Sequence, residues 1–313
     1  MASGASVPQR FVCFSLLAAL ALISWRAAAN SITEIDARGH TVTLAQPAAR
    51  IISLSPHVTE LLYVAGAGDR LIAAVDFSDY PEAARHLPRV GNSSRLDVER
   101  VLALKPDLAI GWKSGNSSED IARLEKLGVH VYVTEVSGVA AIADDIETLG
   151  RLAGTSDVAQ IAGSELREQI AALSQRYTAR VPVTVFYQIW AEPLMTINGR
   201  HFISDSLRIC GGRNIFQDLE PVAPTVTVEA VIAADPQVIV SSSSKDDNDE
   251  QLASWRRWNL MRAVRANALY TIAPDLITRP SARIVEGVEQ LCVALDRARA
   301  QADVQPRSLG ERQ

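Results

Sequence analysis

Aromatic residues are scarce in this chain, at 5% of its 313 residues, and it contains only three cysteines. No two cysteines form a CxxC motif, and the cysteines and histidines do not show the spacing of a zinc site. A glycine-rich phosphate loop and a nucleophile elbow are also missing. We therefore predict a protein that is not an enzyme, with no resident metal and no catalytic cofactor.

Positive charge is not concentrated anywhere in the sequence, and the formal net charge is −5. A nucleic-acid partner would call for a basic patch, often interleaved with aromatic residues, and no such run occurs. Beyond the N-terminal region, no apolar run approaches the roughly 20 residues that a membrane-spanning helix needs. We predict no nucleic-acid partner and no membrane span.

The N-terminal region reads as an export signal. Arg10 precedes the apolar run Phe11–Trp25, and small residues follow up to Ala29. This order predicts a signal peptide at residues 1–29 that is removed after Ala29, and hence a periplasmic protein. The alternative is a membrane anchor, but the apolar run has only about 15 residues against the roughly 20 required. Cys13 lies at the start of that run, where it does not fit a lipoprotein signal.

Export would leave two cysteines, Cys210 and Cys292, in a compartment where disulfides form and persist. They allow one intramolecular bridge, which would enclose about 80 residues. The alternative is two separate buried thiols, because free cysteine is among the most buried residue types. The oxidising compartment favours the bridge.

The mature chain would have about 280 residues, more than a single core usually holds. Short β-branched runs alternate with amphipathic stretches, which predicts an α/β fold with mainly parallel sheets. We expect an N-terminal lobe at 30–154 and a C-terminal lobe at 181–300, followed by a flexible tail at 301–313. Between the lobes, 155–180 is predicted to be one linking helix, since apolar residues recur there every three or four positions.

An internal similarity supports two similar lobes. Residues 98–110 and 228–240 both read as a helix, a proline turn and a buried strand, at a constant offset. Identical residues fall at Val98 and Val228, Glu99 and Glu229, Val101 and Val231, Ala103 and Ala233, and Pro106 and Pro236. Such a helix–proline–strand unit can also arise by convergence. Together with a chain length that predicts two domains, it supports two similar lobes.

Several motifs together carry a family resemblance. They are Ser55–Glu60, Ser78–Pro81, Leu104–Asp107, Gly111–Asn116, Cys210–Phe216, Pro280–Ile284 and Gln290–Cys292. With these motifs the sequence resembles the periplasmic cobalamin-binding proteins of bacterial ABC importers. The resemblance implies two α/β lobes joined by a single helix, with a ligand cleft between them.

The same resemblance implies that cobalamin is a transported ligand, delivered to a permease dimer with its ATPase subunits. Membrane contact would then occur only through the transporter. Some of the motifs are shared with binders of haem and ferric siderophores, so capture of one of those ligands is the main alternative. A secreted corrinoid-dependent sensor or adaptor that never meets a transporter is another.

Aromatic residues with a place in such a cleft are Trp112, Tyr80 and Trp190. Trp112 ends a predicted strand, at the carboxyl edge where open α/β sheets bind ligands. Tyr80 lies in the loop after the preceding strand, and Trp190 holds a comparable position in the second lobe. We expect them to contact a flat ligand, although Trp112 and Tyr80 could instead pack within their own lobe.

Polar ligand contacts are implied for Asp275, Arg279 and Arg283, which surround the motif before the last helix. Guanidinium groups suit amide carbonyls and a phosphate, while Asp275 could accept from amides or cap a turn. His57 follows the proline that opens a helix. It could coordinate cobalt or haem iron, but packing inside the lobe is the more common role for such a histidine.

The sequence departs from the best-known members of the family, which carry tryptophans in the segments that match 91–94 and 221–224. Neither segment contains a tryptophan here. The cleft is therefore either less aromatic than theirs or filled by Trp190, together with Trp255 or Trp258.

Docking to the permease is implied for Glu99 and Glu229, the equivalent acidic residues of the two repeated units. The family places one glutamate on each lobe to meet arginines of the permease. A glutamate in the first turn of a helix is also favoured by the helix dipole alone, by about 0.3 to 1 kcal/mol.

Overall fold

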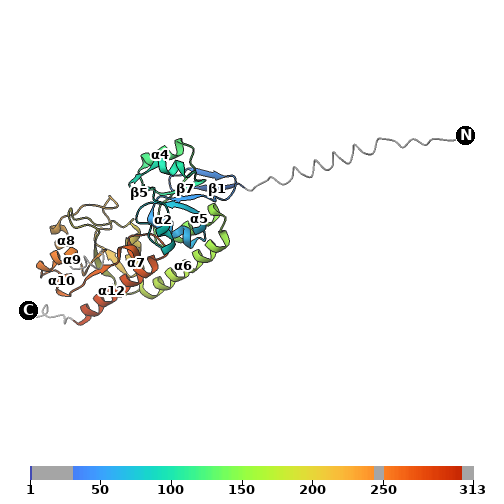
Figure 1. Ribbon diagram of the computed structural model, residues 1–313. Helices are drawn as coiled ribbons and strands as arrows, with labels where there is room; N and C mark the ends of the chain where they lie inside the picture. Colours follow the sequence, from blue (N-terminus) through green and yellow to red (C-terminus); the bar gives the residue numbers. More distant parts are fainter. Residues whose placement is uncertain (2–30, 243–249, 305–313) are drawn as a thin grey trace, which may run out of the picture.

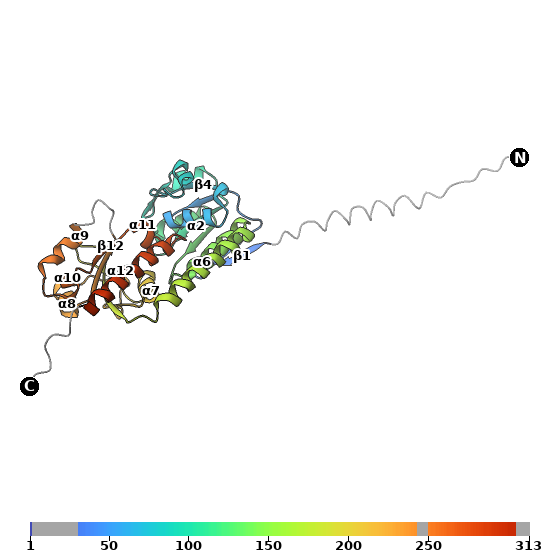
Figure 2. The same ribbon diagram turned by 90° about the horizontal axis from the view of Figure 1, so that it is seen from below.

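The structure is a computed structural model that describes residues 31–242 and 250–304, together with Met1. The predicted export signal, apart from Met1, and the last nine residues, 305–313, lie outside the described residues. The described chain forms two lobes, and helix α6 (Ser156–Tyr177) runs along one side of the molecule from the first lobe to the second (Figures 1 and 2).

The N-terminal lobe is built on a sheet of four parallel strands in the order β4-β3-β7-β8. The strands are β3 (Ile51–Ser53), β4 (Leu71–Ala74), β7 (Leu108–Trp112) and β8 (Val131–Thr134). Its main helices are α2 (Pro56–Val64), α3 (Val98–Ala103), α4 (Ser118–Lys126) and α5 (Ala141–Ala153). Three of the strands are buried along their whole length or nearly so, as expected for a sheet covered on both faces.

The C-terminal lobe repeats this plan with the parallel order β10-β9-β11-β12. Its strands are β9 (Val183–Gln188), β10 (Gly212–Asn214), β11 (Val238–Ser242) and β12 (Leu269–Ile272). In both lobes the strands are ordered second, first, third, fourth, so the second strand lies at an edge and pairs with the first. The repeated sequence units correspond to α3–β7 and α8–β11, where α8 is Val228–Ala234. The prediction of two similar parallel α/β lobes is confirmed.

The remaining elements complete the described chain. They are the antiparallel pair β1 (Ile32–Ile35) and β2 (Thr41–Leu44), the hairpin β5 (Gly91–Asn92) and β6 (Arg95–Leu96), the 3₁₀ turns η1 (Gly68–Arg70), η2 (Glu82–His86) and η3 (Ser254–Arg257), and the helices α7 (Phe202–Ile209), α9 (Glu250–Ala253), α10 (Arg262–Arg265), α11 (Pro274–Ile277) and α12 (Ile284–Val304). Helix α12 extends four residues into the segment predicted to be a tail from 301.

Helix α6 is the predicted link between the lobes, and its observed bounds lie inside the predicted 155–180. It packs on α5 and α2 of the first lobe and on α7 and α12 of the second. The approach to α5 is close, because a Cβ added at Gly150 would lie only 2.2 Å from the Cβ of Ala159. A larger residue at this position would push α6 away from the first lobe.

Buried apolar residues form one core that continues from the first lobe into the second. It includes Leu61, Ile142, Leu166, Leu207 and Leu291, which come from α2, α5, α6, α7 and α12. Each sheet also has a smaller, separate core on its other face. Because the shared core crosses the boundary between the lobes, their relative position is set by packing as well as by the linking helix.

A disulfide joins Cys210, at the end of α7, to Cys292 in α12. Both cysteines are fully buried. The prediction of one intramolecular bridge is confirmed, and the alternative of two separate thiols is not what the structure contains.

Candidate functional site

A cavity of about 350 Å³ lies between the two lobes. Residues that line it from the first lobe include Trp112, Glu135 and Val136, and residues from the second include His201, Phe202 and Pro280. Trp112 ends β7, and Glu135 and Val136 directly follow β8. The cavity is thus bordered by the carboxyl ends of parallel strands, the usual ligand position in such sheets.

Trp112 is held in place by a short polar turn. Its backbone N–H donates to Asn116 Oδ1 over 2.7 Å, and Asn116 Nδ2 donates to the carbonyl oxygens of Leu54 and Ser93 at 2.8 Å each. The indole and the His57 ring are nearly perpendicular, in a T-shaped pair with 5.1 Å between the ring centroids. These contacts leave the tryptophan partly exposed on the cavity wall in a fixed orientation.

His57 itself is buried, with only 3% of its surface exposed. Its Nδ1 lies 2.8 Å from Ser55 Oγ, while its Nε2 has no hydrogen-bond partner within the described residues. Burial, assisted by the nearby charge of Arg279, lowers the pKa of His57 to about 3, so the ring is neutral at physiological pH. His57 lies behind Trp112 and is not among the residues that line the cavity.

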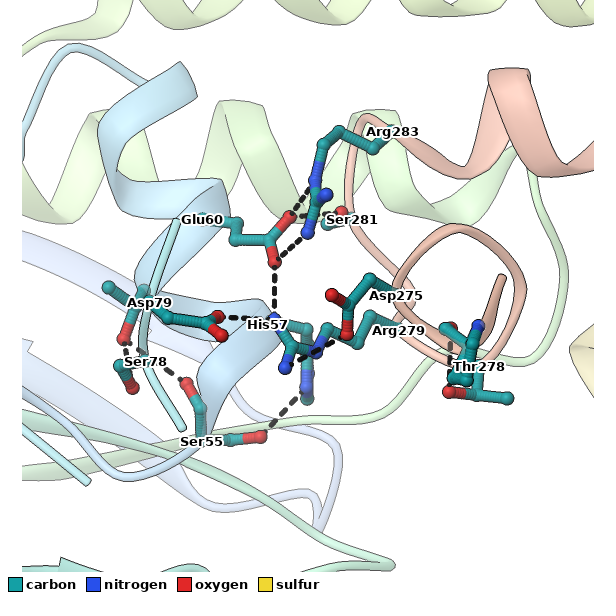
Figure 3. A network of polar contacts seen from close by, with 12 residues as sticks. Ser55, His57, Glu60, Ser78, Asp79, Asp275, Thr278, Arg279, Ser281 and Arg283 are labelled. Carbon is teal, nitrogen blue, oxygen red and sulfur yellow. Dashed lines mark hydrogen bonds and ion pairs between the residues drawn. The ribbon is translucent and has the colours of Figure 1, made fainter. Parts of the chain in front are cut away.

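An ion-pair network centred on Glu60 connects the lobes beside the cavity (Figure 3). Glu60 belongs to α2 and is only 2% exposed. Its carboxylate accepts from Arg283 Nε at 2.9 Å and Nη2 at 2.7 Å, from Arg279 Nη1 at 3.2 Å and from Ser281 Oγ at 2.7 Å. The donors all come from the segment between α11 and α12, so one carboxylate of the first lobe holds a loop of the second.

The two arginines make further contacts in the same network. Arg279 pairs with Asp79 at 2.8 Å and with Asp275 at 3.0 Å. Burial alone would raise the pKa of Asp79, but the hydrogen bond and charge of Arg279 outweigh it and the pKa is lowered. The guanidinium of Arg283 lies 4.0 Å from the centre of the Tyr80 ring, in cation–π geometry. Tyr80 is thereby placed at the boundary between the lobes.

The structure therefore gives Arg279 and Arg283 a role that their sequence positions did not indicate, namely a bridge between the lobes. Glu60 and Asp79 lie within the motifs Ser55–Glu60 and Ser78–Pro81, but their sequence context predicts no specific role for either. The available signal was Glu60 itself, because it interrupts the apolar residues of α2 and a carboxylate on a buried face needs cationic partners.

The remaining tryptophans differ in their positions. Trp190 is 59% exposed, its indole N–H donates to the carbonyl oxygen of Glu192, and it is not among the residues lining the cavity. Trp255 is buried in the core of the second lobe, and Trp258 lines a separate hollow beside α8. Neither Trp255 nor Trp258 borders the cavity, so of the two alternatives the structure favours a cleft that is less aromatic than that of the best-known members.

We predict a large loss of stability for Glu60→Ala. The change leaves the guanidiniums of Arg279 and Arg283, whose side chains are only 17% and 18% exposed, without their shared partner. Removing one partner of a buried ion pair costs about 3 to 5 kcal/mol, and the partial exposure places this case near 3. Unfolding in guanidinium chloride, followed by circular dichroism, measures the difference.

The matched control is Glu82→Ala. Glu82 pairs with Arg85 at 3.4 Å, but the two side chains are 74% and 59% exposed. Surface pairs of this kind contribute about 0 to 1 kcal/mol. If both variants lost the same small amount, the Glu60 network would not hold the lobes together.

Comparisons with known proteins agree with this architecture. The sequence profile of the periplasmic binding protein family matches residues 51–276. The vitamin B12-binding protein of Vibrio cholerae is 38% identical over 256 residues, which are 82% of this chain and 92% of that protein. The vitamin B12-binding protein of Yersinia pestis is 36% identical and is covered to 86%.

Solved structures show the same fold. The crystal structure of the periplasmic vitamin B12 binding protein BtuF of Vibrio cholerae has a TM-score of 0.75 at 37% identity, over 81% of this chain and 98% of that one. The haem-binding protein RhuT of Roseiflexus has a TM-score of 0.70 at 22% identity, over 80% and 98% of the two chains, a likeness of fold alone. No helix in the described part of the chain is long and apolar enough to cross a membrane. Taken with the two lobes and the cavity between them, these matches place the chain in the periplasmic binding protein family.

Proposed function

We propose that this protein captures cobalamin, or a closely related corrinoid, in the periplasm and delivers it to an ABC import permease. The observation that carries the proposal is a cavity between the lobes with Trp112 on its wall, in a chain 38% identical to a vitamin B12-binding protein. The protein would have no catalytic role, and cobalamin would be its cargo.

The chemistry of the cleft suits a flat ligand with amide arms. A corrin ring offers a broad face for an aromatic side chain, and Trp112 supplies one from a fixed position. A corrinoid is larger than the cavity of about 350 Å³, so it would also contact the rim. Tyr80 and Trp190 are exposed by 46% and 59%, and both follow strands of the two central sheets. We assign them to this rim.

Asp275 would supply a polar contact at the edge of the bound ligand. Asp275 uses Oδ1 for its ion pair with Arg279, and its side chain remains 51% exposed. A carboxylate oxygen in this position can accept from an amide NH₂ group. Arg279 and Arg283 would act mainly by holding the lobes and Tyr80 in place, and His57 by supporting Trp112.

The site is tested by Trp112→Ala. We expect the affinity for cyanocobalamin to fall by about 1 to 3 kcal/mol, the range for loss of one aromatic stacking contact. Titration calorimetry on the purified protein measures the change. The control is Trp258→Ala, which removes a tryptophan that borders a different hollow and leaves the affinity unchanged. Equal affinities for Trp112→Ala and the wild type would remove Trp112 from the site.

Delivery requires export and docking. Export would depend on the signal at residues 1–29, and contact with the membrane would occur only through the permease and its ATPase subunits. Glu99 and Glu229 would be the docking residues. Both are exposed in the first turns of α3 and α8, and neither forms an ion pair within the described residues. Their carboxylates are therefore available to arginines of a partner.

A further inference from the structure

His201 lines the cavity, although it belongs to none of the sequence motifs that predicted the ligand site. It immediately precedes α7, and its ring is among the groups that line the cavity from the second lobe. The ring stacks on Phe202, with centroids 4.6 Å apart and an angle of 27° between the planes. An imidazole on a largely apolar wall is a candidate for a directed polar contact to a ligand.

The hydrogen bonds of His201 identify which nitrogen carries the proton. Nδ1 accepts from the backbone N–H of Ile203 at 3.2 Å and so caps the N-terminus of α7. Because a backbone N–H can only donate, Nδ1 must be unprotonated in the neutral ring, and Nε2 then carries the hydrogen. Burial lowers the pKa of His201 to about 4, so the ring stays neutral at physiological pH. Nε2–H forms no hydrogen bond within the described residues.

The wall that carries His201 is rigid. Asp205, in the first turn of α7, accepts from the backbone N–H of Val139 in the first lobe at 2.8 Å. The other end of α7 is tied to α12 by the disulfide at Cys210. A donor fixed in this way loses little entropy when it meets a ligand, which favours a specific contact.

Glu135 provides the complementary group on the wall formed by the first lobe. Its carboxylate accepts from the backbone N–H of Ser114 at 2.9 Å and from Ser114 Oγ at 2.6 Å, which fixes its orientation. Each carboxylate oxygen can accept a further hydrogen bond. The cavity therefore has a neutral donor on one side and an anionic acceptor on the other.

We propose that His201 and Glu135 form a subsite for an uncharged carboxamide arm of the bound corrinoid. His201 Nε2–H donates to the amide oxygen, and Glu135 accepts from the amide NH₂. This subsite rests on the proposed function and deepens it, because it makes the two residues determinants of specificity. A ligand with a carboxylate at the same place is repelled by Glu135 and gains only one of the two contacts.

Coordination of a metal by His201 would require a different arrangement. A histidine that binds metal through Nε2 usually donates a hydrogen bond from its Nδ1–H to a carbonyl or carboxylate oxygen. In His201 the polarity is reversed, since Nδ1 accepts from an amide. Binding cobalt or iron through Nε2 would shift the proton to Nδ1 and break the cap of α7. The donor role keeps that cap intact.

The test uses two substitutions of His201 in the otherwise unchanged protein. His201→Asn retains a side-chain acceptor at the helix cap but has no group at the position of Nε2. We expect its dissociation constant for cyanocobalamin to rise about fivefold to tenfold, as for loss of one net hydrogen bond, with little change in the melting temperature. His201→Gln places an amide donor near the position of Nε2 and should recover part of the affinity. His130→Asn, on the exposed surface, is the matched control.

The role of Glu135 is tested by changing the ligand. Monocarboxylic derivatives of cobalamin, each with one amide arm hydrolysed, should bind the wild type more weakly than cyanocobalamin does. For one isomer this loss of affinity should be smaller in Glu135→Gln.

Three outcomes would contradict the proposal. Wild-type affinity in His201→Asn, with cyanocobalamin bound normally by the wild type, would overturn the subsite alone. Failure of the wild type to bind cyanocobalamin would overturn the proposed function as well. A spectral shift of aquocobalamin on binding that disappears in His201→Asn would show axial ligation and contradict the donor role.

Discussion

Replacing both Cys210 and Cys292 by alanine is expected to lower the free energy of unfolding by about 4 to 5 kcal/mol. The bridge joins residues 82 positions apart, and the chain-entropy model gives a stabilisation of this size for such a loop. Both cysteines are fully buried between α7 and α12, so the substitutions also weaken packing there. Urea unfolding of the oxidised wild type and the double variant measures the difference.

The control for this change is Val293→Ala, next to Cys292 on the same helix. Val293 is 38% exposed, so truncating it should alter stability by about 0.5 kcal/mol or less. Oxidised wild type treated with a reductant in the unfolded state should refold with the lower stability of the double variant. A loss below about 1 kcal/mol for the double variant would contradict a bracing role of the disulfide.

Replacing both Glu99 and Glu229 by alanine is expected to abolish cobalamin-dependent growth while the isolated protein still binds the vitamin. The two carboxylates lie in the first turns of corresponding helices, one on each lobe. They are not among the residues that line the cavity, so ligand affinity should stay within about 0.5 kcal/mol of the wild type. Growth of a strain that lacks its own binding protein, together with calorimetry, separates the two effects.

Glu119→Ala is the matched control for docking, because Glu119 lies in the first turn of α4 in the same kind of position. It should support normal growth. Normal growth with the double variant would remove the docking role of these two residues. A large loss of affinity in the double variant would instead assign these carboxylates to the cleft.

Local patterns predicted the architecture well because each element follows from its own residues. The apolar spacing within 155–180 predicted α6 to within three residues at each end, and the similarity of 98–110 to 228–240 identified matching units of the two lobes. Strands that are buried on both faces appear in the sequence as short continuous apolar runs, and helix starts appear as capping residues. Both signals can be read from neighbouring residues. Trp112 was found at the cavity for the same reason, since it ends a strand.

The pairing of side chains across the lobes could not be predicted in the same way. Glu60 and Arg283 are 223 residues apart, and nothing in either segment identifies the other as its partner. Trp255 illustrates the same limit. The sequence left it as a possible cleft residue, yet its indole packs against Phe186 in the core and donates to Gln188. His201 was missed because a single histidine before a helix has no periodic pattern.

The cleft between the lobes is expected to select a corrinoid over other flat or metal-containing ligands. Cyanocobalamin, haemin and a ferric siderophore added separately to the purified mature protein, with each heat of binding measured by calorimetry, test this selectivity. We expect cyanocobalamin to bind saturably at one molecule per chain, and haemin and the siderophore to give no saturable heat. Saturable binding of haemin or the siderophore, with no binding of cyanocobalamin, would show that the cleft does not select a corrinoid.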